Sequence, residues 1–229
     1  MSSPPFAVSH VIFDIEGTLV AHVRAIRAGL AAAAAEVAAR TGRSDVRPEE
    51  LWAMRNEVAV DPAWRDRSPT AIRRESFRRV LVAYAATEDA LGEVHDGYYR
   101  ARNAALTVFP DVEPALAALQ ARGLMLVAAS NGNVQLDVLG LDRYFAGTQY
   151  ADDIGVWKPN PGFFTLAVER SGVSAAASLA VGDRLDNDYE PARAAGLHAV
   201  LVDRANRVDD AAVVRVRALT ELAALIAPS

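Results

Sequence analysis

Hydrophobic residues form short continuous runs in some parts of the chain and recur at helical spacing in others. The first run covers residues 8–13 and ends at Asp14, with a glycine and a threonine close behind, which predicts a buried strand followed by a turn. Residues 21–103 have a different pattern, because their apolar positions follow a helical period, prolines interrupt the runs and no strand is indicated. We therefore predict an all-helical block of roughly 80 residues directly after the first strand.

After Pro110, short apolar runs alternate with amphipathic segments. The predicted strands are residues 124–129, 147–151, 178–181 and 198–202, and the predicted helices are residues 112–122, 134–139, 161–171, 190–195 and 210–226. Strands that alternate with helices in this way imply right-handed crossovers and a parallel sheet covered on both faces. The chain is therefore expected to be an α/β protein, with residues 1–20 and 104–229 forming the core and residues 21–103 inserted as a helical domain.

The composition narrows the classes of function. Of the 229 residues 52% are hydrophobic, and 29 acids against 24 bases give a net charge of −5, so attraction to nucleic acid or to an anionic membrane is not expected. The absence of cysteine excludes a disulfide framework, a thiolate zinc site and a cysteine nucleophile. No secretory signal or membrane span is indicated, so we expect a cytoplasmic protein, either a monomer or a homodimer.

Three of the predicted strands end in polar clusters, which are residues 14–18, 130–132 and 182–188. In open parallel sheets, ligands bind beyond the carboxyl ends of the strands, so these clusters are expected to meet in space. Carboxylates from two strand ends, Asp14 and Asp183, offer the hard oxygen ligands that suit Mg²⁺.

A loop before one predicted helix carries Lys158, the only lysine in a chain whose other basic residues are all arginine. An ammonium, the Ser130 hydroxyl and loop amides around a divalent cation suit a phosphoryl group, whose transfer depends on positioning and on neutralising charge. An aspartate such as Asp14 can attack phosphorus directly. A second acid two residues later, Glu16, could protonate the leaving oxygen and then activate water.

Four segments in this order, residues 13–19, 130–132, 158–159 and 181–188, resemble the four motifs of the haloacid dehalogenase superfamily, in its phosphatase branch with a helical cap inserted after the first motif. The resemblance implies a Rossmann-like sheet of about five or six parallel strands. It also implies residue roles: Asp14 as nucleophile and metal ligand, Glu16 as acid/base and, through its carbonyl, metal ligand, Ser130, Asn131, Gly132 and Lys158 as phosphate-binding residues, Lys158 as a catalytic group, and Asp183 and Asp188 as metal ligands.

One residue departs from the common pattern. Most phosphatases that this chain resembles carry Asp at the position of Glu16, whereas the enolase-phosphatase branch carries the same Asp-Ile-Glu-Gly-Thr segment. The true dehalogenases of the superfamily usually have Tyr there and lack the Gly-Asp metal motif, so Glu16 and Asp183 both argue against dehalogenation.

The sequence therefore predicts an Mg²⁺-dependent phosphatase that acts on a small phosphorylated metabolite. The alternatives are a phosphosugar mutase of the same fold, a catalytically weak protein that binds phosphorylated ligands, and, least favoured, a 2-haloacid dehalogenase. Arginines within residues 55–79 have two interpretations: contacts to a second anionic group of the substrate, or the favoured one, a solvated helix face paired with acids.

Overall fold

The computed structural model describes residues 4–65 and 67–228. Contacts divide the chain into two compact units, one made of the residues up to Val20 and from Val108 onward, the other of Ala21–Thr107. Two short strands, β2 (Val20–Ala21) and β3 (Thr107–Val108), pair where the chain passes from one unit to the other. None of the helices in the described residues combines the length and the apolar composition that a bilayer crossing needs.

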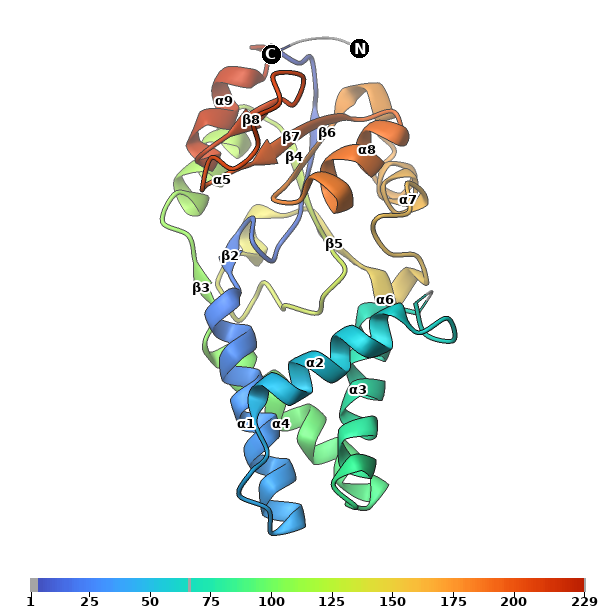
Figure 1. Ribbon diagram of the computed structural model, residues 1–229. Helices are drawn as coiled ribbons and strands as arrows, with labels where there is room; N and C mark the ends of the chain where they lie inside the picture. Colours follow the sequence, from blue (N-terminus) through green and yellow to red (C-terminus); the bar gives the residue numbers. More distant parts are fainter. Residues whose placement is uncertain (1–3, 66, 229) are drawn as a thin grey trace. The chain divides into compact units, whose positions relative to one another are not determined.

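A six-stranded parallel sheet forms the centre of the first unit (Figure 1). Its strands, in spatial order, are β5 (Gly147–Tyr150), β4 (Met125–Ser130), β1 (His10–Phe13), β6 (Ser178–Gly182), β7 (His198–Val202) and β8 (Arg215–Val216). The first strand lies between β4 and β6, with Phe13 level with Ala128 on one side and with Val181 on the other. The predicted α/β class and parallel sheet are confirmed.

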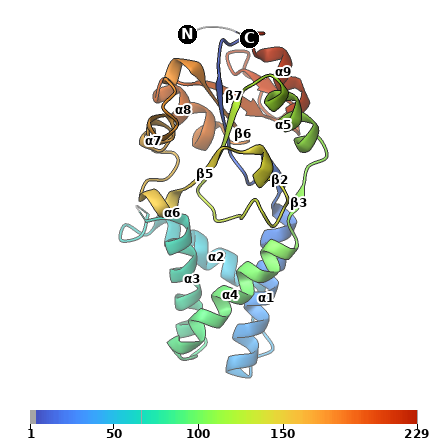
Figure 2. The ribbon, with the colours of Figure 1, turned by 180° about the vertical axis from the view of Figure 1, so that it is seen from behind.

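Helices cover both faces of this sheet. Figures 1 and 2 show α5 (Val112–Ala121) and α9 (Leu222–Leu225) on one side, and α7 (Gly162–Ser171) and α8 (Glu190–Ala194) on the other. The apolar side chains of α7 and α8 pack against alternate residues of the strands, Ile12 and Ala180 among them. The shorter elements are α6 (Ala151–Ile154), η2 (Asp142–Tyr144), η3 (Ala175–Ala177), η4 (Leu185–Tyr189) and η5 (Leu219–Glu221).

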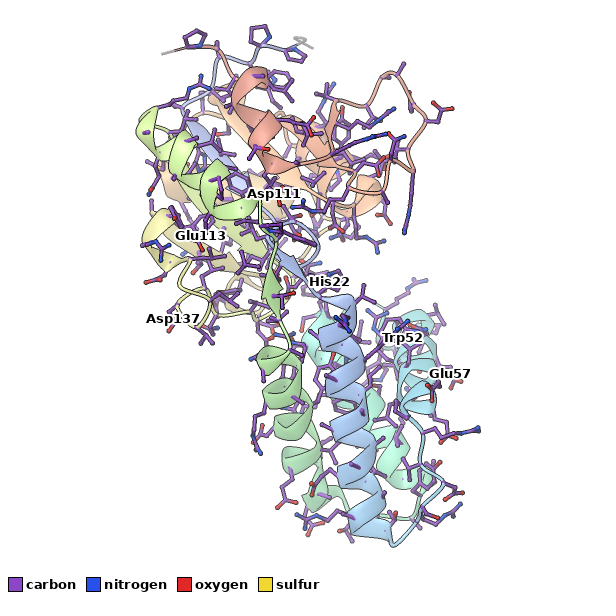
Figure 3. The ribbon with its side chains drawn as sticks, turned by 90° about the vertical axis from the view of Figure 1, so that its left-hand side faces the viewer. His22, Trp52, Glu57, Asp111, Glu113 and Asp137 are labelled. Carbon is purple, nitrogen blue, oxygen red and sulfur yellow. The ribbon has the colours of Figure 1, made fainter. Side chains whose placement is uncertain are left out.

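In its described residues, the second unit contains four helices, α1 (Val23–Thr41), α2 (Pro48–Val60), α3 (Pro69–Ala83) and α4 (Leu91–Ala104), with the short turn η1 (Glu88–Ala90) before the last. All four contribute to one core, in which Phe77 and Tyr98 stack edge to face. Gly29 allows α1 and α4 to approach closely, because a methyl group there would meet the ring of Tyr98 at 2.8 Å. Figure 3 shows Trp52 and Glu57 on α2.

The helix predicted over residues 134–139 is absent. The segment forms turns, in which Leu139 and Leu141 both donate to the carbonyl of Leu136. The prediction was wrong because the apolar residues are not used at helical spacing: Val134 and Leu136 are buried, whereas Val138 is 74% exposed.

The closing helix predicted over residues 210–226 is also wrong. The described chain instead forms β8, then η5 and the short helix α9. The β-branched valines near position 214 suit a strand, and the open edge of β7 gives this segment a partner, with Val202 level with Val216. Tertiary pairing therefore determines its structure more than helix propensity does.

Candidate active site

The carboxyl ends of β1, β4 and β6 bring the predicted motifs together. Asp14 follows β1 directly, Ser130 ends β4, and Asp183 follows β6. The Asp14 N–H continues the ladder, since it donates to the carbonyl of Val181 at 2.9 Å. Because these strands are neighbours in the sheet, side chains more than 100 positions apart in sequence emerge at one edge, as expected from the polar clusters.

Hydrogen bonds hold both carboxylate oxygens of Asp14. Lys158 Nζ donates to Oδ1 at 2.5 Å, and Thr18 Oγ1 donates to Oδ2 at 3.0 Å. Asp14 is only 9% exposed, and this burial raises the pKa of its carboxyl, while the charge of Lys158 opposes the rise. The carboxylate is therefore fixed in orientation from two sides.

Lys158 lies in the loop between α6 and α7 and is 2% exposed. Its ammonium has three donors, and it directs them to Asp14, to Asp188 Oδ1 at 2.6 Å and to the Ala129 carbonyl at 3.4 Å. Burial by itself lowers the pKa of Lys158, but the carboxylates of Asp14 and Asp188 raise it above its ordinary value. Lys158 is therefore positively charged at neutral pH.

The side chain of Asn131 fixes the backbone of that loop. Asn131 Nδ2 donates to the Lys158 carbonyl at 2.8 Å, and the Lys158 N–H donates to Asn131 Oδ1 at 2.8 Å. No feature of the sequence indicated this contact, since the resemblance implied only a phosphate-binding role for Asn131. The two motifs are thus joined through one amide side chain.

Three carboxylates lie close together, and the Lys158 ammonium contacts two of them, Asp14 and Asp188. One oxygen from each of Asp14, Asp183 and Asp188 lies within 4.8 Å of the others. Burial, followed by the neighbouring negative charges, raises the pKa of Asp183 to about 7. Burial also raises the pKa of Asp188 to about 6, although Lys158 lowers it. At neutral pH this cluster has an excess of buried negative charge.

Two glycines make room for the cluster. A methyl group on Gly17 would overlap the carboxylate of Asp183, and Gly17 has φ = +103°, which side chains rarely adopt. A methyl group on Gly182 would overlap the side chain of Asp188. The close approach of the acids therefore depends on glycine in two of the motifs.

The donor set fits a divalent cation. Oxygen ligands from carboxylates are those that Mg²⁺ and similar hard cations prefer. With Lys158 supplying one positive charge, the three acids leave two negative charges to be balanced when all of them are ionised. A buried excess of this size is costly unless a cation compensates it. The residues predicted to bind metal through their side chains are thus brought together.

Glu16 does not join this acid cluster. Its carboxylate accepts a hydrogen bond from Ser130 Oγ, and that oxygen in turn accepts a hydrogen bond from the Gly132 N–H at 2.7 Å. The predicted acid/base and the predicted phosphate-binding segment are therefore in direct contact. Metal ligation by the backbone carbonyl of Glu16 stays a prediction.

A further residue, Arg204, was not identified from the sequence. It pairs with Asp111 at 2.9 Å, donates to the Thr18 carbonyl at 2.9 Å, and lies 3.9 Å from the ring centroid of Phe109. Asp111 Oδ2 also accepts the Leu219 N–H at 2.6 Å. Figure 3 shows Asp111 at the start of α5. The segment that carries Thr18 is thus tied to the strand-to-helix loop before α5.

The arginines of the helical unit are not alike. Arg79 pairs with Glu75 at 2.9 Å, as expected for an ion-paired helix face. Arg73 is 8% exposed and lies over the rings of Trp52 and Tyr98, at 5.8 and 5.0 Å. A contact between any of these arginines and a second anionic group of a substrate stays a prediction.

Comparison with known proteins agrees with the motifs. The chain is similar to a phosphoserine phosphatase of Thermus thermophilus, at 30% identity over 71% of this chain and 66% of that protein, just under two thirds of its length. It is similar to a ribulose-1,5-bisphosphate 5-phosphatase of Halopiger xanaduensis, at 31% identity over 87% of this chain and 86% of that protein.

A solved structure of similar fold is the 2-haloacid dehalogenase of Pseudomonas syringae pv. tomato, with a TM-score of 0.79 and 30% identity, covering 94% of this chain and 96% of that one. The family model described as haloacid dehalogenase-like hydrolase matches residues 8–196. The chain therefore belongs to the haloacid dehalogenase-like hydrolases.

Proposed function

We propose that this protein is an Mg²⁺-dependent phosphatase that hydrolyses a small phosphorylated metabolite through an aspartyl-phosphate on Asp14. The observation that carries the proposal is the contact between Lys158 and Asp14 beside two further acids, the partly buried Asp183 and the buried Asp188. Phosphatases among the similar proteins support the same reaction class. The proposal includes a cytoplasmic location and action as a monomer or homodimer.

In the first step a carboxylate oxygen of Asp14 attacks the phosphorus atom, and the bond from phosphorus to the leaving oxygen breaks. Glu16, in its protonated form, gives its proton to that oxygen. Lys158 holds Asp14 in position and neutralises charge on the transferring group. Thr18 keeps the second oxygen of Asp14 from rotating.

In the second step Glu16, now a carboxylate, takes a proton from a water molecule that attacks the phosphorus. The bond from phosphorus to Asp14 breaks, and inorganic phosphate and the original carboxylate are formed. Asp14, Asp183 and Asp188 would hold Mg²⁺, which supplies positive charge against the phosphoryl oxygens when bound.

The phosphate group has donors at the end of β4. Ser130 donates to Glu16 in this structure, and a substrate phosphate oxygen would take the place of that acceptor. The N–H groups of the loop that follows, at Asn131 and Gly132, complete the proposed phosphate site.

A specific observation favours one other function, 2-haloacid dehalogenation, because the protein of that name from P. syringae has a similar fold. The partly buried Asp183 argues against it, since an acid beside Asp14 is useful for holding a cation and repels an incoming carboxylate substrate.

Product analysis with a panel of candidate substrates tests these functions. The purified protein is incubated with Mg²⁺ or with a chelator, against phosphate monoesters, hexose 1-phosphates and 2-haloacids. We expect phosphate release that depends on Mg²⁺. Isomerised hexose phosphate without free phosphate would favour the mutase, and chloride release without metal the dehalogenase. Saturable binding of phosphorylated compounds without turnover would favour a binding protein.

A further inference from the structure

The carboxylate of Glu16 occupies the space beside Gly132 that a side chain would otherwise fill. A Cβ atom built on Gly132 would overlap Glu16 Oε1 and Cδ. Glu16 is held there by the hydrogen bond from Ser130, whose oxygen also accepts the Gly132 N–H. The Ser130 hydroxyl therefore links the carboxylate of Glu16 to the backbone of Gly132.

The backbone at this position does not require glycine. The glycines of the described chain with φ in the left-handed region do not include Gly132, so an alanine could adopt its conformation. The reason for glycine here is therefore space. The end of the Glu16 side chain fills that space. An aspartate at position 16 would leave it free, because its side chain is shorter by one methylene group.

We infer that Gly132 is a positioning residue that allows a glutamate, in place of the aspartate of most related phosphatases, to serve as the acid/base at position 16. The inference rests on the proposed function. The atoms that an added methyl would meet belong to the far end of a flexible side chain, so Glu16 can rotate away at little cost to the fold. A displaced acid is costly for turnover, because about 1 Å of misplacement can lower a rate by about 100-fold.

A double-mutant cycle tests the pairing, with Gly132→Ala, Glu16→Asp and the double variant compared with the natural protein. We expect Gly132→Ala to lower kcat by at least about 10-fold with Glu16 present, with a smaller change in KM. In the Glu16→Asp background the same change is expected to cost less than about 3-fold, because the shorter acid leaves the methyl group room.

Comparing rates for two leaving groups distinguishes a displaced general acid from a general structural effect of the substitution. A displaced general acid matters most for alkyl phosphates, whose leaving oxygen needs a proton, and least for p-nitrophenyl phosphate, whose leaving group is stable as an anion. Gly132→Ala should therefore slow the alkyl ester more than the nitrophenyl ester. Gly147→Ala is the matched control, because a Cβ there meets no atom within 4 Å.

Each outcome bears on the inference. Equal losses from Gly132→Ala in both backgrounds would overturn it, as would no loss with Glu16 present. If Gly132→Ala fails to fold while the double variant folds, the clash with Glu16 is supported; if neither folds, the methyl group meets more than Glu16 and the inference is wrong. Absence of phosphatase activity in the natural protein would instead refute the proposed function.

Discussion

Lys158 donates a hydrogen bond to Asp14 at 2.5 Å, across 144 positions of sequence. The same ammonium binds Asp188, so a single cation holds two buried carboxylates, one directly after β1 and the other in η4 after β6. Its three donors are all directed to oxygen atoms. A planar guanidinium offers five donors in a wider fork and does not match this arrangement.

Replacing Lys158 tests that geometry. Lys158→Arg keeps the charge and is expected to lower kcat by at least about 100-fold, because the fork displaces Asp14. Lys158→Met is expected to destabilise the metal-free protein more at pH 8 than at pH 5, since the acids left without a partner are ionised at the higher pH. Kinetics and thermal denaturation measure both effects.

The control for this substitution is Arg184→Lys, because the Arg184 side chain pairs with Asp186 at the surface. This variant is expected to keep near-normal turnover. A Lys158→Arg protein as active as the control would show that the ammonium has no special role.

Asp183→Asn tests the excess of buried negative charge. The pKa of Asp183 is about 7, above its ordinary 3.8, so the folded metal-free protein keeps a proton that the unfolded chain loses between these values. The contribution of Asp183 to the free energy of unfolding therefore declines as the pH rises from about 4 to 7. Removing the charge is expected to raise the Tm of the metal-free protein at pH 8 by a few °C (about 2–4 °C per kcal/mol), and less at pH 5.

With Mg²⁺ bound at pH 8, the natural protein is expected to have a higher Tm than Asp183→Asn, the reverse of the metal-free order. The natural protein gains stability on binding the cation, whereas the Asp183→Asn variant has lost a ligand and gains less. Asp186→Asn is the matched control, because this acid lies on the same loop and is exposed. If Mg²⁺ stabilises Asp183→Asn as strongly as the control, the cation does not bind at this cluster.

Arg204 offers a test of the scaffold behind Asp14. Arg204→Ala removes the ion pair with Asp111 and the hydrogen bond to the Thr18 carbonyl, and the free energy of unfolding is expected to fall by about 1–3 kcal/mol. Urea denaturation at pH 7 measures the loss, and the exposed Arg217→Ala serves as the control. An Arg204→Ala protein as stable as the control would mean that the contacts around Thr18 contribute nothing.

Much of the fold follows from local sequence. Strands such as β6, a continuous apolar run bounded by turn residues, and helices such as α7 have patterns that fix their type without long-range information. The strand ends also indicate chemistry, because residues such as Asp14 interrupt an apolar run with a charge that would be costly unless it were used.

The wrong and missing predictions share a cause. Residues 134–139 and 210–226 have apolar content that suits a helix, and their structure depends on what lies beside them, such as the free edge of β7. The hydrogen bonds from the Asn131 side chain to the Lys158 backbone and the close packing of Glu16 against Gly132 depend on distances that no spacing in the sequence encodes. These contacts could not have been predicted from composition or period.

The role of Asp14 as nucleophile is tested most directly by the kcat/KM for Mg²⁺-dependent phosphate release by Asp14→Asn, measured against the natural protein on the best ester from the panel. Asn keeps the size of the side chain and removes the nucleophile, so we expect a loss of at least about 10³-fold in a variant that thermal denaturation shows to be folded. Turnover by Asp14→Asn at the rate of the natural protein would contradict this role.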